Sequence, residues 1–138
     1  MRGIQSVTAD KERILITKMD PIILFVSRFS DCLSFYRKAL GLSLKKQVAG
    51  WAEFDVGGAT FALHSMEDHE PKSSTKTHEG PLALHFVTRD MKRVQEAIEA
   101  WGGSMVEGPE EKDYSTSKVL EATFRDPDGN EMEIVEYL

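Results

Sequence analysis

The residue best suited to chemistry in this sequence is Glu133, which lies in the C-terminal stretch RDPDGNEMEIVE (residues 125–136). The start of that stretch has the composition of a tight turn, in which Pro presets φ, Gly accepts positive φ, and Asp and Asn bond the local backbone. The rest alternates in the manner of a strand with one buried face. Alternation assigns Met132 and Ile134 to the core, so we expect Glu133 to face the other side of the strand.

Several roles are open to a carboxylate in that position. Glu133 could serve as a catalytic base or as a metal ligand, since both roles require an anionic oxygen that reaches a cleft. It could also contact a ligand or have a structural partner, for which the sequence offers Arg125, Arg89 and the hydroxyl group of Tyr114. Arg125 and Tyr114 are therefore candidates for the ligand-binding surface as well.

The composition excludes several classes of protein. The chain has 138 residues, 41% of them hydrophobic, which suits one domain with a core. The net charge is −6, without a basic stripe, so neither a nucleic acid nor an anionic membrane is expected as a partner. The single cysteine cannot form an internal disulfide, and no stretch is apolar and long enough for a signal peptide or a membrane span. These features predict a soluble, cytoplasmic protein.

The pattern of apolar residues and turns divides the chain into two similar halves. In the first half, residues 21–26 predict a buried strand, and a helix capped by Ser30 or Asp31 follows and ends at Gly41. Three strands, the last two joined by a Gly-Gly hairpin, are then expected at residues 42–48, 51–56 and 60–65.

The second half repeats the order of one strand, one helix and three strands. Residues 81–88 predict the first strand, and Asp90 is expected to cap a helix whose apolar stripe ends in Trp101, which we assign to the core. The remaining strands are expected at residues 104–107, 118–125 and 131–137. A run of acidic residues is interpreted as a solvated loop and comprises Glu107, Glu110, Glu111 and Asp113.

A duplicated β-α-β-β-β unit explains this repetition. The segment DVGGATFALH (55–64) matches DPDGNEMEIV (126–135) almost position for position. We therefore divide the chain into an N-terminal extension (1–19) and a single domain (20–138). That domain consists of module 1 (20–66), a polar linker expected to be mobile (67–80) and module 2 (81–138).

These features together resemble the vicinal oxygen chelate superfamily, which includes glyoxalase I, methylmalonyl-CoA epimerase, extradiol dioxygenases, fosfomycin-resistance enzymes and bleomycin-binding proteins. The resemblance rests on the paired modules, the helix SFYRKALGL, the hairpin AEFDVGGATFALH and the closing FRDPDGNEMEIVE. It implies an α+β fold in which two β-α-β-β-β modules form a half-open curved sheet, with helices outside and a ligand cleft inside. It does not identify the activity, because this fold supports many chemistries.

The resemblance also implies where a metal would be held. Metal-using members supply two ligands per module, one early in the first strand and one in the last strand. Those positions correspond here to Pro21, Ala62, Ala83 and Glu133. Because a lone carboxylate is a poor site for a divalent transition metal, a cleft without a metal is the favoured interpretation.

A different metal set remains open. His64 and His85 lie two residues beyond Ala62 and Ala83, so strand alternation aims them at the same face. Together with Glu133 they would form a two-histidine, one-carboxylate set suited to Fe, Mn, Ni or Zn. Both histidines would be displaced by about 6.5 Å from the positions of the family's ligands. The alternative is that both line the cleft and contact the ligand or one another.

Four further residues are expected to line the cleft. Alternation places Trp51, Glu53 and Asp55 opposite the core-facing residues of their strand, and Phe25 has the same phase in the first strand. Trp51 would form an aromatic wall for a flat ligand, or pack at a rim or a dimer contact. The two carboxylates would favour a cationic ligand.

Two functions follow from these residues. The first is a protein that binds a small organic ligand without a metal, by sequestration as in the bleomycin-resistance type. The second is a lyase, isomerase or dioxygenase that uses a divalent metal (Zn, Ni, Mn or Fe) held by Glu133, His64 and His85. In either case a homodimer is expected, because an open sheet edge and a concave face gain from being covered.

Overall fold

The computed structural model describes residues 15–66 and 82–138. Module 1 contains β1 (Ile22–Val26), α1 (Phe29–Ser34), the π-helical turn η2 (Phe35–Ala39), β2 (Ser43–Val48), β3 (Trp51–Val56) and β4 (Ala59–Ser65). Module 2 contains β5 (His85–Val87), α2 (Met91–Ala100), β6 (Ser104–Asp113), β7 (Lys118–Arg125) and β8 (Glu131–Tyr137). The linker predicted at residues 67–80 lies outside the described residues, so its mobility stays a prediction.

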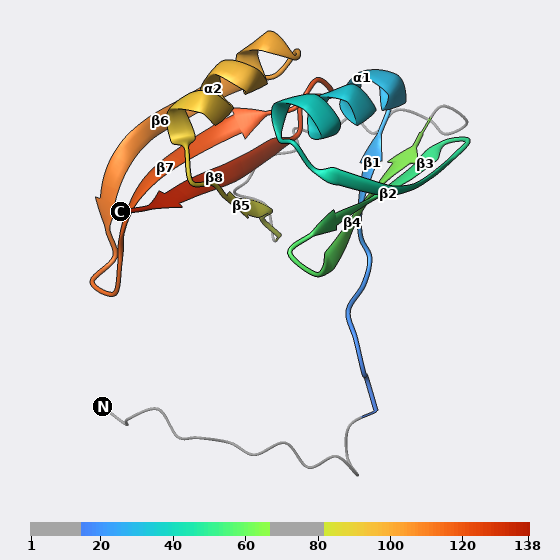
Figure 1. The fold of residues 1–138 in the computed structure, drawn as a ribbon, viewed down its shortest axis with the longest axis horizontal. Helices are drawn as coiled ribbons and strands as arrows, with labels where there is room; N and C mark the ends of the chain where they lie inside the picture. The colour runs from blue at the N-terminus through green and yellow to red at the C-terminus, as the bar shows by residue number, and fades with distance from the viewer. Residues whose placement is uncertain (1–14, 67–81) are drawn as a thin grey trace.

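Each module forms a four-stranded sheet of the same topology. The strand orders are β1-β4-β3-β2 and β5-β8-β7-β6, with the first and last strands of each module parallel and the other pairs antiparallel. The helices lie along one side of the two sheets and leave the other side uncovered (Figure 1). The expected duplicated α+β fold is therefore confirmed. None of the helices in the described parts of the chain has the length and apolar character that crossing a membrane requires.

One core serves both modules and lies between the helices and the sheets. Its largest fully buried side chains include Phe35 and Tyr36 from η2 and Phe124 from β7. The rings of Phe61 in β4 and Phe86 in β5 meet edge to face with 6.0 Å between centroids, so aromatic packing crosses the boundary between the modules. Shared packing of this kind holds the two sheets in one body.

The start of α2 and the β3–β4 hairpin follow the expected pattern. Asp90 caps α2, because its Oδ1 accepts a hydrogen bond from the backbone N–H of Arg93 at 3.1 Å. Gly57 and Gly58 form the hairpin turn with φ values of 57° and 92°, which a residue with a Cβ rarely adopts.

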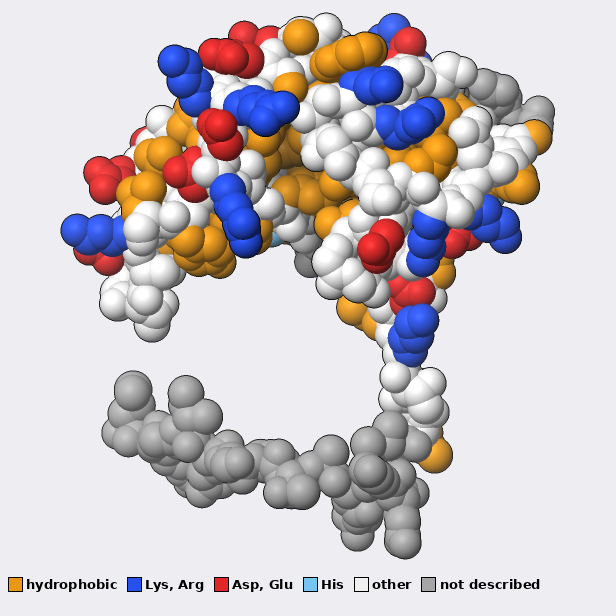
Figure 2. Space-filling view, viewed as in Figure 1, with side chains coloured by type: hydrophobic (Ala, Val, Ile, Leu, Met, Phe, Trp, Pro, Cys, Tyr) orange, Lys and Arg blue, Asp and Glu red, His pale blue; other side chains and the backbone are white. Residues whose placement is uncertain are grey.

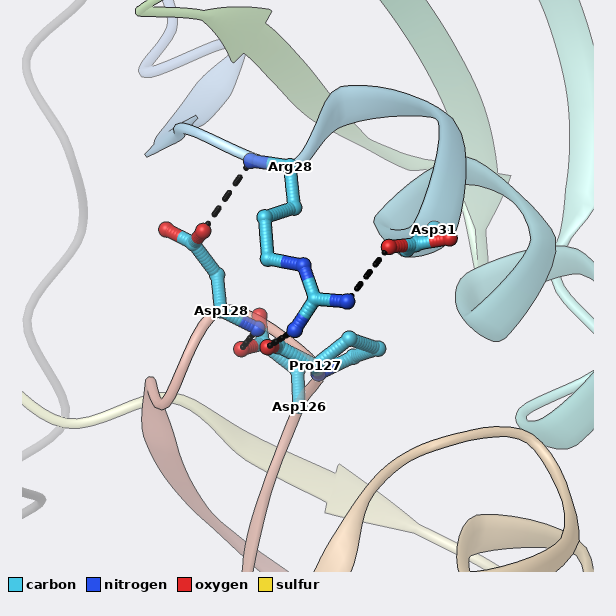
Figure 3. A network of polar contacts seen from close by, with 5 residues as sticks. All are labelled: Arg28, Asp31, Asp126, Pro127 and Asp128. Atoms are coloured by element: carbon cyan, nitrogen blue, oxygen red, sulfur yellow. Dashed lines mark hydrogen bonds and ion pairs between the residues drawn. The ribbon is translucent and has the colours of Figure 1, made fainter.

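The start of α1 differs from the expected cap at Ser30 or Asp31, since the helix already begins at Phe29 and Arg28 occupies the cap position. The capping acceptor comes instead from module 2. The carboxylate of Asp128 accepts a hydrogen bond from the backbone N–H of Arg28 at 3.0 Å (Figure 3). It also accepts one from the backbone N–H of the preceding residue at 3.1 Å. A carboxylate at a helix N-terminus also complements the helix dipole.

The acidic segment of module 2 is a strand, not the solvated loop that we expected. β6 extends to Asp113, well beyond the predicted end at residue 107, and it pairs with β7 along its length. Pairing across the β6–β7 hairpin accounts for the difference, and the side chains stay hydrated because β6 is an edge strand. The four residues, all exposed, are Glu107, Glu110, Glu111 and Asp113. β5, by contrast, is shorter than the predicted strand at residues 81–88.

Trp101 does not belong to the core as expected, since 45% of its surface is exposed. α2 ends at Ala100, and Trp101 already has non-helical backbone angles of φ −110° and ψ 23°. The apolar stripe predicted from helical spacing therefore ends before it reaches this residue.

A buried carboxylate, Asp126, organises the turn between β7 and β8. Its Oδ2 accepts hydrogen bonds from the Tyr36 hydroxyl at 2.7 Å and from Asn130 Nδ2 at 2.9 Å. Its Oδ1 accepts the backbone N–H groups of Asp128 and Asn130, each at 2.9 Å. Burial raises the pKa of Asp126, and the hydrogen bonds from Asn130 and Tyr36 oppose that rise. Because Tyr36 belongs to module 1, the turn is fastened to both modules.

We predict that Tyr36→Phe lowers the free energy of unfolding by about 1–3 kcal/mol, because it removes a donor from a buried carboxylate. Tyr114→Phe is the matched control: Tyr114 is exposed, so the loss of its hydroxyl should change that free energy by less than about 0.5 kcal/mol. Urea unfolding of both variants measures the difference.

The deficit of Tyr36→Phe should also depend on pH. The pKa of Asp126 is higher in the folded protein than in the unfolded chain, so its contribution to stability is full below the unfolded value and is lost as the pH rises through the folded value. Loss of the Tyr36 donor raises the folded pKa further. The deficit should therefore be smaller in acid, below about pH 5, than at about pH 7, and an equal or larger deficit in acid would contradict this account.

Candidate functional site

The predicted site residues lie on the open faces of the two sheets, which we define as the faces away from α1 and α2. Strand alternation produces this arrangement: Ala52 and Phe54 in β3 are fully buried on the helix side, and their neighbours point the other way. The open face of module 1 carries Phe25, Trp51, Glu53, Asp55 and His64, and that of module 2 carries His85, Arg125 and Glu133.

Three rings form an aromatic cluster on module 1, composed of Phe25, Trp51 and His64. The sheet register sets them side by side, because His64 in β4 pairs with Phe25 in β1 and with Trp51 in β3. The His64 ring centroid lies 5.3 Å from that of Phe25 and 5.6 Å from that of Trp51. Phe25 is 37% exposed, so the cluster is accessible from the open side. Such a surface can receive the flat face of a ligand.

A carboxylate accompanies the aromatic cluster. Trp51 Nε1 donates a hydrogen bond to Glu53 Oε2 at 2.8 Å, which fixes the indole ring beside an anionic group. Asp55 is exposed on the same strand, four residues from Trp51 and therefore about 13 Å along it. Glu53 is thus part of the immediate surroundings of the cluster, and Asp55 is not.

Module 2 carries a different arrangement, the His85–Glu133 pair. β5 and β8 run parallel with these two residues in register, and His85 Nε2 lies 2.5 Å from Glu133 Oε2. The backbone N–H of Glu133 donates to the carbonyl oxygen of Leu84 at 3.0 Å, which holds β8 against the start of β5. The side chain of His85 is 49% exposed and that of Glu133 is 14% exposed, so the pair can be reached from solvent.

Two of the partners considered for Glu133 in the sequence, Arg125 and Tyr114, contact other carboxylates. Arg125 pairs instead with Glu131, at 3.2 Å between Nη2 and Oε2, and these two residues are register partners at the end of the β7–β8 ladder. The Tyr114 hydroxyl donates to Glu121 Oε2 at 2.7 Å. This hydrogen bond, together with partial burial and the charges of Glu121 and Glu133, raises the pKa of Tyr114. Tyr114 and Glu121 thus lie within electrostatic range of the pair.

The two modules differ at equivalent positions. Glu133 and Ala62 each lie four residues beyond a turn glycine, and their register partners are His85 and Ile23. Module 1 therefore has two apolar side chains where module 2 has the His85–Glu133 pair. The same scaffold presents an aromatic surface on one sheet and a polar histidine–carboxylate pair on the other.

The described residues do not bring together the alternative metal set of His64, His85 and Glu133. His64 contacts Phe25 and Trp51 in one sheet, whereas His85 and Glu133 pair in the other. Across residues 15–66 and 82–138, no group of three or more His, Cys, Asp or Glu side chains is placed to hold a metal ion. Within these ranges, His85 and Glu133 could supply two metal ligands from one chain. Catalytic zinc sites use three protein ligands.

Sequence reasoning missed Glu121 as a member of the open face of module 2. The sequence did indicate this position, because the alternation that buries Ala122 and Phe124 turns Glu121 to the opposite side of β7. Its contact with Tyr114 could not be predicted, because it depends on how far β6 continues before the hairpin turns back. The direct contact between His85 and Glu133 likewise depends on the register of two parallel strands.

Comparison with known proteins agrees with this architecture. The model of the Glyoxalase/Bleomycin resistance protein/Dioxygenase superfamily matches residues 18–134. The chain is 34% identical over 129 residues to virulence protein STM3117 of Salmonella typhimurium, covering 91% of this chain and 88% of that protein. The crystal structure of STM3117 has a TM-score of 0.63, with 91% of this chain and 100% of that chain covered.

A second solved structure, the integron cassette protein VCH_CASS1 from the mobile metagenome of V. cholerae, is 25% identical with a TM-score of 0.64. That match covers 91% of this chain and 98% of the cassette protein. The resemblance found in the sequence is thus confirmed by family model and by fold. The chain belongs to the Glyoxalase/Bleomycin resistance protein/Dioxygenase superfamily.

Proposed function

We propose that this protein binds a small, flat organic cation on its open faces, without a bound metal, and acts in the cytoplasm by sequestering that ligand. The aromatic cluster of Phe25, Trp51 and His64 is the observation that carries the proposal. Three adjoining rings on an accessible sheet face provide a stacking surface, and Glu53 beside Trp51 supplies negative charge. The His85–Glu133 pair provides the second, polar wall, with Glu133 as the residue to hold or act on the ligand.

Charge supports a cationic ligand over an anionic one. The chain carries a net charge of −6, and the open face of module 2 adds Glu121, Glu131 and Glu133. Two cations on that face, Arg125 and Lys112, are paired with Glu131 and Glu110. A field of this sign attracts cations and repels carboxylates or phosphates.

A homodimer is part of the proposal. Ile22 and Ile23 on β1 are each 40% exposed, and β1 lies at the edge of its sheet. A second copy that covers this strand would bury apolar surface and deepen the cleft beside the open face of module 1.

The ligand class can be tested with three probes that share one ring system. N-methylquinolinium (cation), quinoline (neutral) and quinoline-2-carboxylate (anion) should bind in that order of decreasing affinity in calorimetric titrations. Trp51→Ala should weaken N-methylquinolinium binding about tenfold, since it removes a stacking ring. Glu53→Gln and Glu133→Gln should weaken the cation and leave the neutral probe unchanged.

Trp101→Ala is the matched control, because Trp101 is exposed at the end of α2 and lies outside the open faces. It should bind all three probes like the wild type. Equal affinity for the three probes, or full binding by Trp51→Ala, would contradict the proposal.

The assembly is tested separately by light scattering at micromolar concentrations. We expect a mass of twice 15.5 kDa, and a replacement of the exposed Ile23 by Asp should reduce it to that of one chain. A mass of 15.5 kDa for the wild-type protein would contradict the dimer but not the ligand class.

A divalent-metal-dependent lyase, isomerase or dioxygenase is the second candidate, favoured by the contact between His85 Nε2 and Glu133 Oε2. Imidazole and carboxylate are the ligand types of such metals, and here they meet on neighbouring strands. A third ligand would have to come from outside the described residues of the same chain.

Metal analysis separates the two candidates. We expect the protein, purified without added metal, to contain much less than one equivalent of Fe, Mn, Ni, Co or Zn per chain. One equivalent that disappears in both Glu133→Gln and His85→Ala would instead establish the metal-dependent candidate. Circular dichroism of the variants checks that they remain folded.

A further inference from the structure

An apolar groove runs between the two modules, apart from the aromatic cluster. It has a volume of about 390 Å³, within the range of small-molecule sites. In Figure 2, hydrophobic side chains gather in the hollow where the modules meet. Its walls come from both modules, with Leu40, Leu42 and Val56 on one side and Phe86, Val94 and Ile134 on the other.

The described lining also includes Gly57, Val87 and two polar side chains, His85 and Thr88. The described lining contains no Asp, Glu, Lys or Arg. The groove is therefore suited to an aliphatic chain, since it offers apolar contact along its length and few groups that would have to lose water.

The polar end of the groove selects the head group of such a ligand. His85 lines the groove and at the same time contacts the carboxylate of Glu133, so an anionic group lies just beyond the groove. Among its described lining residues there is no lysine or arginine to neutralise a carboxylate or phosphate head. A primary ammonium group, with three donors and a positive charge, matches a carboxylate-imidazole pair.

We infer that the groove binds an aliphatic primary amine, with the alkyl chain between the modules and the ammonium group at the His85–Glu133 pair. This site goes beyond the proposed function, because it uses neither the aromatic cluster nor a flat ligand. It shares only the His85–Glu133 pair with the proposed function. The apolar groove and the aromatic cluster are separate surfaces, so each can be tested without the other.

A homologous series tests the apolar part. Butylamine, pentylamine and hexylamine should bind with an affinity that rises about fourfold per added methylene, as expected for burial of each CH₂ group. Hexanol should bind more weakly than hexylamine, and hexanoate more weakly still. Methyl resonances of Leu40, Leu42, Val94 and Ile134 should shift during the titrations, which are followed by NMR.

A charge introduced at the mouth of the groove tests the head group. Val87 lines the groove two residues from His85 and is 64% exposed, so Val87→Arg is expected to fold normally. It should reduce hexylamine binding at least tenfold and increase hexanoate binding. Val106→Arg is the matched control, since Val106 is also exposed on module 2 but does not line the groove, and it should behave as wild type.

Other results would overturn the inference. They are equal binding of hexylamine and hexanoate, an affinity that does not depend on chain length, or an equal response of Val87→Arg and Val106→Arg. Loss of hexylamine binding in Trp51→Ala would place the amine at the aromatic cluster and likewise overturn the groove site. If N-methylquinolinium did not bind as expected but the amine series did, the proposed function would be wrong and the groove site would stand.

Discussion

The hydrogen bonds around Asp126 are the constraint on which the arrangement of the two modules depends. Charge in a protein interior is costly unless it is fully hydrogen-bonded, and Asp126 has four donors, one of which, the Tyr36 hydroxyl, comes from the other module. The neighbouring Asp128 accepts the N–H groups at the start of α1, and the Arg28 guanidinium donates to the carbonyl oxygen of Pro127 at 3.3 Å while it pairs with Asp31 at 2.9 Å (Figure 3). One turn of module 2 thus fixes the position of the first helix of module 1. Burial, together with these charges, raises the pKa of the Cys32 thiol, whose side chain packs in the core.

The turn also determines which side chains of β8 face the open side of the sheet. Because β8 leaves it with Met132 and Ile134 buried against the helices, Glu133 has to face the open side, where the parallel strand β5 presents His85 in register. A shift of one residue would bury the carboxylate and expose two core side chains. The same logic in module 1 buries Phe61 and Leu63 against the helices and turns His64 to the open face, while Ala62 has the phase of His64 but is itself fully buried. The duplicated scaffold therefore dictates which positions are open, and the residues at those positions determine the chemistry.

Local rules predicted the parts of this structure that depend on local interactions. The Gly57-Gly58 hairpin, the Asp90 cap and the orientation of Glu133 required only backbone preference and alternation, and all three expectations are confirmed. The cap of α1 was predicted incorrectly because its acceptor, Asp128, lies 100 residues away. Two of the partners considered for Glu133, Arg125 and Tyr114, contact Glu131 and Glu121 instead, which sequence alone could not indicate. Sequence reasoning therefore fails for contacts between residues far apart in the chain, and not for particular residue types.

Stability and chemistry are carried by separate side chains in this protein. The groups that join the modules, Tyr36 and Asp126, are at most 3% exposed, whereas the side chain of His85 is 49% exposed on a sheet face. Substitution of an exposed side chain such as His85 removes little buried surface, so such a position can change without loss of the fold. Where module 2 has His85 and Glu133, module 1 has Ile23 and the fully buried Ala62 on the same backbone. A scaffold that carries both sets at equivalent positions can change the chemistry of a sheet face by side-chain replacement alone, in agreement with a fold that supports many chemistries.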